Sequence, residues 1–399
     1  MTDASYVVVG AGIIGAAVGR EILRRYPESS VTVLEKEHRA AVHQTGHNSG
    51  VVHAGLYYEP GGLKARLCRR GVSLLKDFCA EKDLPYLECG KLVVALDAAE
   101  EARLGWIHAR AVANGVPGVR LVDAAGIRDI EPNAVGRAAL ASPGTAVVDY
   151  TAITRALVDD IVAAGGTVQF GREVVRIERT AGRSIVHTDA GPVTADHVIV
   201  CAGAQSDRVA RRSGGPRHPS IVPFFGQYFL LEHAYSGILR GLVYPVPDPR
   251  YPFLGVHLTK RFDGEMTVGP NAFLSLSRDR YRGLGLRPRD LAVTLADPGF
   301  WRFSAKNMPS AVREARTVLS QRFFLREARR YVPSLEGATA TRIERGIRAQ
   351  AMDAAGTLLD DFVIETDAAA THVRNAPSPG ATSSLAIAEH LVDAVVARA

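Results

Sequence analysis

The sequence has few cysteines and no long apolar run, and each absence excludes a class of protein. Four cysteines occur in 399 residues and none of them forms a Cys-x-x-Cys pair, so neither a disulfide scaffold nor a cysteine-rich metal site is expected. No run approaches the roughly 18 apolar residues that a membrane-spanning helix needs. The first apolar run begins at Tyr6 and leads into a glycine-rich turn, so we expect no secretory signal peptide and a cytoplasmic protein with reduced thiols.

The charge of the chain is basic, with a net charge of +6 and a pI near 9.2. Such a balance favours anionic substrates or an anionic membrane surface, although arginine spread over solvated helices produces the same value. The arginine-rich stretch 208–212 has no interleaved aromatic residues, so nucleic-acid binding is not expected. We expect a small-molecule partner and a location in the cytoplasm, either free or peripheral to a membrane. The sequence leaves the oligomeric state open.

The clearest motif is Gly-x-Gly-x-x-Gly, formed by Gly10, Gly12 and Gly15. It follows an apolar strand and opens a helix, and the next strand ends at Glu35, which is the context of a dinucleotide-binding βαβ unit. Gly10 permits the tight turn, Gly12 lets a diphosphate approach the backbone, and Gly15 lets the helix pack closely on the strand. The helix N-terminus offers free N–H groups to phosphates. The Glu35 carboxylate can accept hydrogen bonds from ribose hydroxyls and disfavours the 2′-phosphate of NADP.

A polar stretch from residue 43 to residue 58 holds the highest density of functional groups in the chain. It reads HQTGHNSGVVHAGLYY, with three histidines, two side-chain amides, small hydroxyls and three glycines. Such a loop supplies hydrogen bonds to a phosphate or a ring and lets the backbone pass close to a ligand. A surface loop with inert histidines is the alternative, but the Val-Val pair and the two tyrosines favour a buried segment.

The rest of the chain alternates between helical and strand patterns. Helices are expected at 63–82, 100–114, 151–164, 289–331 and 385–398, and strands at 91–96, 167–170, 173–179, 184–188, 195–201, 221–231 and 371–374, with a hairpin at 352–364. The strand that closes at Cys201 ends in Ala202 and Gly203, a second small-residue turn where backbone can approach a long dinucleotide. The last helix is preceded by a cap at 375–384, which is either a plain N-cap or an anion-stabilising terminus beside a reduced flavin.

Several further stretches extend these motifs along nearly the whole chain, at 34–37, 89–91, 244–248, 252–257, 269–272, 348–350 and 375–379. Together with the glycine motif and the specific HQTGHNSG loop, they resemble the FAD-dependent L-2-hydroxyglutarate oxidases and dehydrogenases, within the D-amino-acid-oxidase-like (glycine-oxidase-like) superfamily. The resemblance implies an α/β fold with a Rossmann-type FAD-binding domain built from discontinuous segments, plus an antiparallel-sheet-and-helix substrate domain. The segments expected are 1–88, 145–214 and 340–399 for FAD, and 89–144 and 215–339 for the substrate.

The resemblance also implies FAD as the cofactor and oxidation of a 2-hydroxy acid, similar to L-2-hydroxyglutarate, to the 2-oxo acid by hydride transfer to flavin N5. The expected cofactor-binding residues are Gly10, Gly12, Ile14, Gly15, Glu35, Lys36, Thr45, Gly46, Asn48, Ser49, Val174, Ala202, Gly203, Arg348, Pro379, Gly380, Ala381 and Thr382. The sequence leaves open whether oxygen, a quinone or a carrier protein accepts the electrons, and no metal is expected.

The general base should be an imidazole, because its pKa lies near the operating pH. We predict His53 for this role, with His257 and His47 as the other candidates, and we predict that Arg348 holds a carboxylate. The other expected substrate contacts are Tyr57, Phe225, Gln227, Lys260 and Asn271.

Two positions depart from the resembled pattern. Phe225 stands where the family usually has an arginine, whose fork binds a carboxylate bidentately, and Ser277 replaces a family lysine. An alternative function is therefore the oxidation of another alcohol or amine, such as an amino sugar or a specialised metabolite. A second alternative is a non-catalytic protein that keeps an inactive FAD site, against which the intact histidine loop argues.

Overall fold

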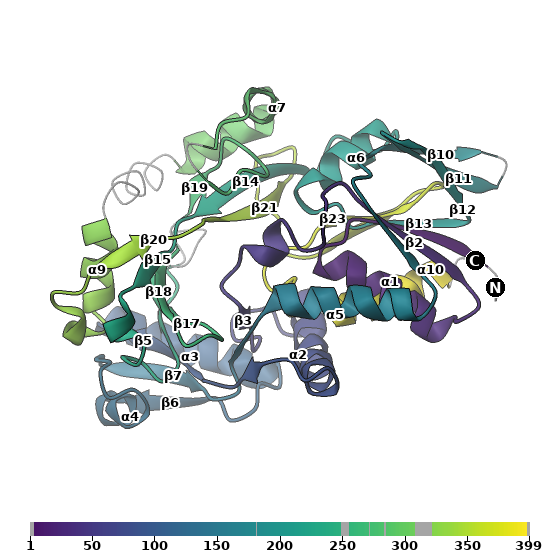
Figure 1. Ribbon diagram of the computed structural model, residues 1–399. Coiled ribbons are helices and arrows are strands. Elements are labelled where there is room, and N and C mark those ends of the chain that lie inside the picture. The colour runs from purple at the N-terminus through teal and green to yellow at the C-terminus, as the bar shows by residue number, and fades with distance from the viewer. Residues whose placement is uncertain are drawn as a thin grey trace.

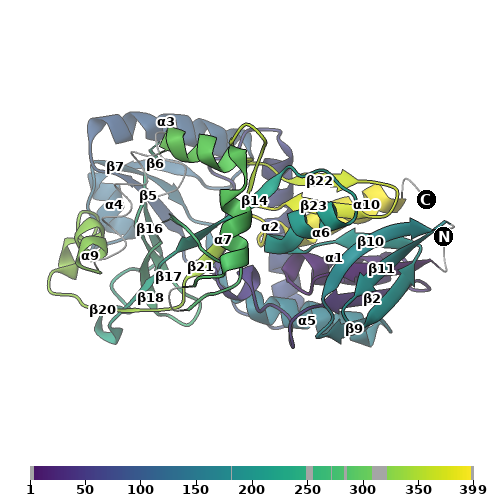
Figure 2. The same ribbon diagram turned by 90° about the horizontal axis from the view of Figure 1, so that it is seen from above.

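The computed structural model describes residues 4–180, 182–248, 255–270, 272–282, 285–307 and 321–396. The chain forms two lobes that lie side by side, and both termini lie at the far end of one lobe (Figures 1 and 2). Two small sheets and several loops join the lobes. Among the described residues, no helix combines the length and the apolar character needed to cross a bilayer.

The lobe that carries the termini is built on a six-stranded sheet. Its strands are, in order, β22 (Val363–Thr366), β23 (Thr371–Asn375), β13 (His197–Val200), β1 (Ser5–Val9), β2 (Ser30–Glu35) and β9 (Thr167–Phe170). All neighbours pair in parallel except β22 with β23, and β1 lies in the middle with Val8 opposite both Val33 and Ile199. The continuous apolar run of β1 is explained by this position, because a central parallel strand is buried on both faces.

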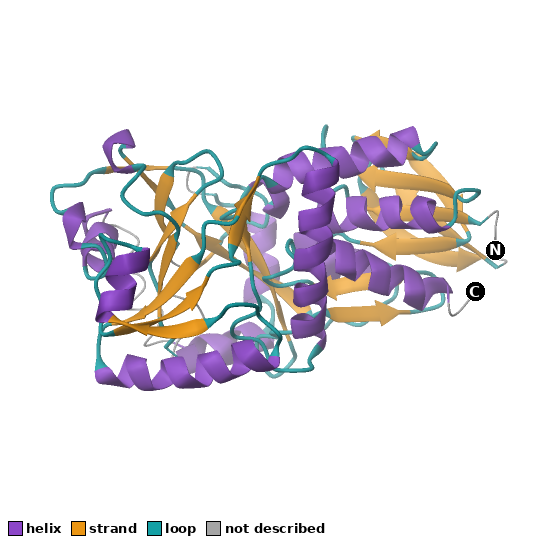
Figure 3. Cartoon of the chain, turned by 90° about the horizontal axis from the view of Figure 1, so that it is seen from below, coloured by secondary structure: helices purple, strands orange, loops and turns teal. Residues whose placement is uncertain are grey.

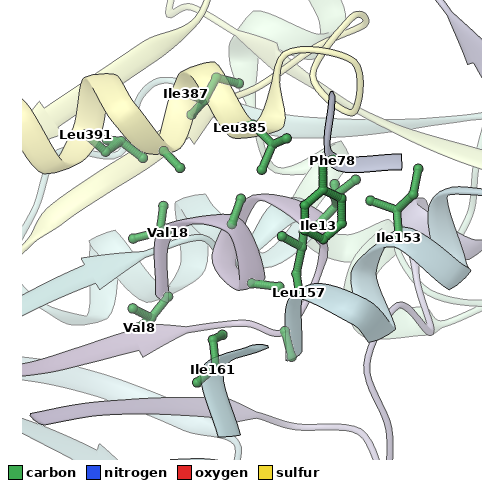
Figure 4. Packing of buried hydrophobic residues seen from close by; sticks show 14 of the residues in the cluster. Val8, Ile13, Val18, Phe78, Ile153, Leu157, Ile161, Leu385, Ile387 and Leu391 are labelled. Carbon is green, nitrogen blue, oxygen red and sulfur yellow. The ribbon is translucent and has the colours of Figure 1, made fainter. Parts of the chain in front are cut away.

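One face of this sheet is covered by helices. They are α1 (Ile13–Arg25), α5 (Tyr150–Ala163), α10 (Ser384–Val396) and, behind them, α2 (Leu63–Glu81). Val8 of the sheet, Val18 of α1, Leu157 of α5 and Leu391 of α10 belong to one buried cluster (Figure 4). Truncating such a buried leucine to alanine costs about 2–5 kcal/mol. The N-terminal and C-terminal segments are thus held together by a shared core.

The other face is covered by a three-stranded antiparallel sheet and a short helix. These elements are β10 (Val174–Thr180), β11 (Arg183–Thr188), β12 (Gly191–Ala195) and α6 (Ser206–Arg212). Val7 and Val9 point into this second cluster, whereas Val8 points into the helical one, as the two-residue period of a strand requires. The lobe is therefore a three-layer unit, whose helices and strands are distinguished in Figure 3.

The second lobe is built on an eight-stranded sheet. Its strands are, in order, β20 (Ala340–Arg342), β15 (Phe229–Leu231), β18 (Met266–Gly269), β17 (His257–Lys260), β16 (Leu242–Pro245), β5 (Lys91–Ala95), β7 (Ala138–Ser142) and β6 (Arg120–Asp123). All neighbours are antiparallel except β5 with β16. On β5, Leu92 and Val94 pack with α4 (Ala124–Ile130) and α9 (Gln321–Arg329), whereas Val93 and Ala95 pack with α3 (Ala98–Ala113).

Two small sheets lie between the lobes (Figure 1). One consists of β19 (Phe273–Leu274), β14 (Ser220–Gly226) and β21 (Gly346–Met352), and the other of β3 (Val51–Val52), β8 (Ala146–Val148) and β4 (Tyr86–Leu87). The remaining elements include α7 (Pro288–Leu295), a helical stretch at 298–307, and the 3-10 turns η1 (Gln44–Gly46), η2 (Gly203–Gln205), η3 (His233–Tyr235) and η4 (Pro333–Leu335). The predicted α/β architecture, with a parallel and a largely antiparallel sheet, is confirmed.

Three local predictions differ from the structure. The hairpin at 352–364 is wrong: the turn at Asp353 forms, but only one bridge joins Met352 to Leu358, and β22 pairs with β23 instead. The single strand at 221–231 is split into β14 and β15, which belong to different sheets. The helical block at 289–331 contains α7 and α9, and its residues 308–320 lie outside the described residues.

Candidate functional site

A cavity of about 980 Å³ lies where the two lobes meet. Its wall combines the glycine turn after β1, the loop around η1, the turn after β13, the segment 376–382 and residues of β16, β17 and β21. Ligand sites usually measure about 300–1,000 Å³, so this cavity is at the large end of that range. Its size suits a cofactor together with a small substrate.

The glycine turn is shaped by close backbone contacts. Gly10 has a φ of +100°, and a Cβ there would lie 2.6 Å from the carbonyl oxygen of Cys201. A Cβ on Gly15 would lie 1.9 Å from the carbonyl oxygen of Gly10, so the helix can approach the strand only with glycine at this position. A Cβ on Gly12 would meet only the Thr45 hydroxyl, at 3.4 Å, and the rest of its surroundings is open. The open space at the N-terminus of α1 is the cradle that a diphosphate requires.

Glu35 is held at the end of β2 by two backbone donors. The N–H of Ala11 donates to Glu35 Oε2 at 2.8 Å, and the N–H of Glu37 donates to Oε1 at 2.9 Å. A carboxylate has about four lone-pair sites, so two remain for ribose hydroxyls. Lys36 lines the same region and pairs with Glu37 at 2.6 Å.

The loop around η1 is folded by its own polar groups. The Asn48 amide donates to the carbonyl oxygen of Thr45 at 2.6 Å and accepts from the N–H of Gly50 at 2.8 Å. The Thr45 hydroxyl accepts from the N–H of Ile13 at 3.1 Å, which joins the loop to the start of α1. Gly46 does not line the cavity, and a Cβ there would lie 2.5 Å from the carbonyl oxygen of Ala41. Gly46 therefore permits the close packing of this loop.

His47 is engaged on three sides. Its Nδ1 donates to the carbonyl oxygen of His43 at 3.0 Å, its Nε2 lies 2.8 Å from a Glu344 carboxylate oxygen, and its ring stacks on Tyr281 at 3.8 Å. The ring lines the cavity, but both of its nitrogens already have protein partners. The structure thus argues against His47 among the three candidate bases.

His53 and His257 both line the cavity, and burial is the main cause that lowers the pKa of each to about 3, with a further contribution from Lys91. Both imidazoles are therefore neutral at pH 7. Nδ1 of His257 lies 2.9 Å from the carbonyl oxygen of Gly255, which can only accept, so Nδ1 carries the proton and Nε2 carries the lone pair. Nε2 of His53 lies 3.3 Å from the Ser378 hydroxyl.

The C-terminal turn at 379–382 closes the wall beside His53. The Thr382 hydroxyl accepts from the N–H of His53 at 3.1 Å and lies 3.0 Å from the Tyr150 hydroxyl. A Cβ on Gly71 of α2 would lie 2.4 Å from the carbonyl oxygen of Thr382, so α2 packs directly against the turn. These contacts fix the turn relative to the histidine loop.

Cations and tyrosines complete the wall. Arg348 of β21 lines the cavity beside Tyr228; burial raises the pKa of Tyr228, and the guanidinium of Arg348 acts in the opposite direction. Lys64 of α2 also lines the cavity, and its ammonium donates to the carbonyl oxygen and a carboxylate oxygen of Asp360, at 2.6 and 2.7 Å. The charged side chains that lower the pKa of His53 and His257 are cations such as Lys91 and Arg348. Among the described residues, no carboxylate contributes to either shift.

The structure brings most of the predicted residues together. The predicted cofactor-binding residues line the cavity except Gly46, and so do His47, His53, His257 and Tyr57. Phe225, Gln227 and Lys260 lie outside its wall: the Phe225 ring stacks on Phe273, and the Gln227 amide donates to the carbonyl oxygens of Tyr228 and Ile343. Asn271 lies outside the described residues.

The wall also contains residues that sequence reasoning did not assign to the site, among them Tyr58, Lys64, Tyr150, Tyr228 and Tyr244. Tyr58 and Tyr244 belong to stretches that carry the resemblance, so those stretches were a signal for them. Lys64 and Tyr150 lie on amphipathic helices, and no local pattern marks them. Their place in the wall depends on how α2 and α5 pack.

Residues 5–394 match the family described as FAD dependent oxidoreductase. The chain belongs to this family. The protein is thus an FAD-dependent oxidoreductase, as the resemblance implied. The glycine cradle and the Glu35 carboxylate fit the cofactor of this family, because they present open space to a diphosphate and free lone pairs to a ribose.

Relatives in this family match over nearly the whole chain. The L-2-hydroxyglutarate dehydrogenase of Indibacter alkaliphilus is 38% identical and covers 96% of this chain and 97% of its own length. The human mitochondrial L-2-hydroxyglutarate dehydrogenase is 39% identical, and the match covers 98% of this chain and 88% of the length of the human protein. Solved structures share the fold at lower identity. L-alpha-glycerophosphate oxidase from Mycoplasma pneumoniae, with FAD bound, has a TM-score of 0.75 at 22% identity and covers 98% of this chain and 94% of its own.

Proposed function

We propose that this FAD-dependent oxidoreductase oxidises L-2-hydroxyglutarate, or a closely similar 2-hydroxy acid, to the 2-oxo acid. The observation that carries the proposal is the joint placement of two neutral imidazoles and Arg348 in the cavity beside the glycine cradle. Support comes also from relatives named L-2-hydroxyglutarate dehydrogenase at 38–40% identity. In this proposal the six-stranded lobe holds the cofactor and the eight-stranded lobe forms the substrate side.

The reaction removes two hydrogens from the carbinol group. Bound FAD supplies the acceptor for the hydride that leaves the carbinol carbon. We assign the hydroxyl proton to Nε2 of His53, with His257 as the second candidate. The low pKa of each imidazole keeps the ring neutral before the substrate binds, and at His53 the substrate hydroxyl replaces the Ser378 hydroxyl as the partner of Nε2. A dianionic substrate then raises the pKa of a nearby imidazole, because a negative charge favours the protonated form.

The carboxylate next to the carbinol carbon needs a fixed partner. Arg348 projects from β21 into the same cavity as His53, and a guanidinium can hold a carboxylate through two parallel hydrogen bonds. Such a clamp orients the reacting carbon, and orientation contributes a large share of the rate in enzymes of this kind.

The substrate assignment is tested by product formation. The holoenzyme is mixed with L-2-hydroxyglutarate and an artificial electron acceptor, and 2-oxoglutarate is measured with a coupled dehydrogenase. We expect product from the L-enantiomer and little from the D-enantiomer. Absence of product from L-2-hydroxyglutarate at millimolar concentration, with turnover of a neutral alcohol or an amine, would support the alternative function.

The alternative function, oxidation of another alcohol or an amine, depends on the phenylalanine at position 225. Phe225 lies outside the cavity wall, its ring stacking on Phe273 at 5.5 Å and lying beneath the Arg345 guanidinium at 4.9 Å. Because residue 225 is not part of the wall, the change from arginine to phenylalanine leaves the charge of the wall unchanged. The substrate panel decides between the two functions.

We further propose that the electrons pass to oxygen or a quinone, and that the protein works in the cytoplasm or at the surface of a membrane. The four cysteines are free thiols, which fits a reducing compartment, and the net charge of +6 favours contact with anionic lipid. Rates of reoxidation of the reduced protein by dissolved oxygen and by a soluble quinone would distinguish the acceptors.

A further inference from the structure

Lys91 is a buried cation beside the cavity. It is the first residue of β5, where it pairs with Ser142 of β7 and Leu242 of β16, and it is 4% exposed. Its ammonium lies 4.3 Å from the ring centroid of Tyr244 and 5.3 Å from that of Tyr57. Within the described residues, no carboxylate lies within ion-pair distance of Lys91 and no side chain or carbonyl accepts a hydrogen bond from it. By contrast, Lys64 has Asp360 as its partner.

The position of Lys91 follows from the two-residue period of β5. Leu92 and Val94 point toward α4 and α9, so Lys91 shares the opposite face with Val93 and Ala95. Ala54 and Leu56, which belong to the loop after His53, pack against that face. The strand therefore directs the lysine at the histidine loop, and both tyrosines that flank its ammonium line the cavity.

The protein alone does not compensate the charge of Lys91. Removing a charged group from water costs more free energy than its cation–π contacts recover. Burial lowers the pKa of Lys91 only to about 8, so the ammonium form prevails at pH 7. The Tyr57 hydroxyl close by is also buried and has no hydrogen-bond partner among the described residues. An ammonium and a hydroxyl without partners together fit a carboxylate that accepts from both.

We propose that Lys91, with Tyr57, holds the distal carboxylate of the substrate and thereby selects dicarboxylic over monocarboxylic 2-hydroxy acids. This inference rests on the proposed oxidation of a 2-hydroxy acid, in which Arg348 holds the carboxylate next to the reacting carbon. Lys91 supplies the second cation from just behind the wall, where its ammonium lies against Tyr57 and Tyr244, two residues that line the cavity. With Arg348 it gives the site two positive charges for a dianion.

The first test separates binding from chemistry. Glutarate and butyrate, which cannot be oxidised in this way, are titrated into the holoenzyme and followed by the change in flavin absorbance. We expect K91M to weaken glutarate binding about 100-fold, since truncating one partner of a buried charge pair removes a large share of the affinity, and to change butyrate binding less than about threefold. The matched control is K76M at an exposed lysine, which should behave like the wild type.

The second test uses catalysis. L-2-Hydroxyglutaramate carries a neutral amide in place of the distal carboxylate. We expect K91M to raise the KM for L-2-hydroxyglutarate about 100-fold with little change in kcat, and to leave the KM for the amide nearly unchanged. An equal loss with both substrates, or no loss with either, would overturn the proposal. If the wild type oxidises neither compound but binds glutarate through Lys91, the proposed function has failed and the carboxylate site stands.

A third variant covers the case in which K91M loses its cofactor or does not fold. K91R keeps a positive charge above pH 8, whereas Lys91 loses its charge there. The other groups around it do not titrate between pH 7 and 9.5: burial raises the pKa of Tyr57, Tyr244 and Cys68 and lowers that of His53 and His257 to about 3. The other charges that act on the neighbouring His53 are those of Lys64 and Arg348.

We therefore expect the glutarate Kd of the wild type to rise about tenfold per pH unit above pH 8, and the Kd of K91R to stay nearly constant up to pH 9.5. Identical pH profiles for the two proteins would contradict a role for the Lys91 charge in binding.

Discussion

The two ends of the cavity differ in whether backbone or side chains form the wall. At the glycine turn the wall is mostly backbone, shaped by contacts such as that of Gly15 with the carbonyl oxygen of Gly10. At the other end the wall consists of ionisable and aromatic side chains from separate segments, such as His53, His257 and Lys64. A backbone-shaped site leaves a contiguous motif in the sequence, whereas a side-chain site depends on how distant segments pack. Substitutions at the two ends should therefore act through different properties, backbone sterics at one end and charge at the other.

The largest effect is expected for G15A. The added Cβ would lie 1.9 Å from the carbonyl oxygen of Gly10, so α1 must separate from β1. We expect loss of bound FAD and of much of the thermal stability, measured by the ratio of flavin to protein absorbance and by calorimetry. Gly105 is a matched control, because its Cβ position within α3 is open, and G105A should be neutral or slightly stabilising. Normal FAD content in G15A would show that the close backbone contact at Gly15 is not required for FAD binding.

The next effect concerns the base. Replacing a general base typically lowers the rate by about 10²–10⁴-fold, so H53A should slow anaerobic flavin reduction by that factor. H47A should have a much smaller effect, because both ring nitrogens of His47 already have protein partners. Stopped-flow absorbance measures both variants. An unchanged rate in H53A, together with a large loss in H257A, would transfer the role to His257.

The two buried histidines also predict how stability depends on pH. Their pKa values fall from 6.5 in the unfolded chain to about 3 in the folded one, so the unfolded state binds more protons between these values. Stability is then fully present above pH 6.5 and falls as the pH drops toward 3, by up to about 1.4 kcal/mol per pH unit for each histidine. Urea unfolding at several pH values measures the slope, and H257N should reduce it. A slope that H257N leaves unchanged would mean that His257 is not buried in its neutral form.

A smaller effect is expected for E35Q. A hydrogen bond to a charged group contributes about 1.5–3 kcal/mol, so losing the Glu35 charge should weaken FAD binding about 10- to 100-fold. The Kd is measured by adding FAD back to the deflavinated protein. E88Q is the control, since Glu88 pairs with Lys76 at the surface. Equal FAD affinity in E35Q and the wild type would remove Glu35 from the cofactor site.

The sequence was sufficient where local chemistry alone determines structure. The βαβ unit, its glycines and Glu35 lie within 35 residues, and their geometry follows from sterics that any such motif obeys. The sequence was insufficient where the outcome depends on packing. The turn at Asp353 formed as its residues indicate, but β22 paired with β23, and no local pattern shows which sheet edge a strand will join.

The same limit applies to the side chains of the cavity. Lys64 and Asp360 are 296 positions apart in sequence and meet only because α2 packs against the C-terminal segment. Gln227 was expected to contact the substrate, yet its amide satisfies two carbonyl oxygens where β14 gives way to β15. Residue type indicated the chemistry in such cases, but the tertiary contacts determined which residues reach the cavity.

The most direct measurement is an anaerobic titration of the purified protein with L-2-hydroxyglutarate while the flavin absorbance is recorded. We predict a yellow protein whose flavin is fully bleached by about one equivalent of the L-enantiomer, because one hydride and one proton leave each substrate molecule. A well-folded preparation that contains no flavin and accepts none, or a flavin that L-2-hydroxyglutarate leaves oxidised, would contradict this prediction.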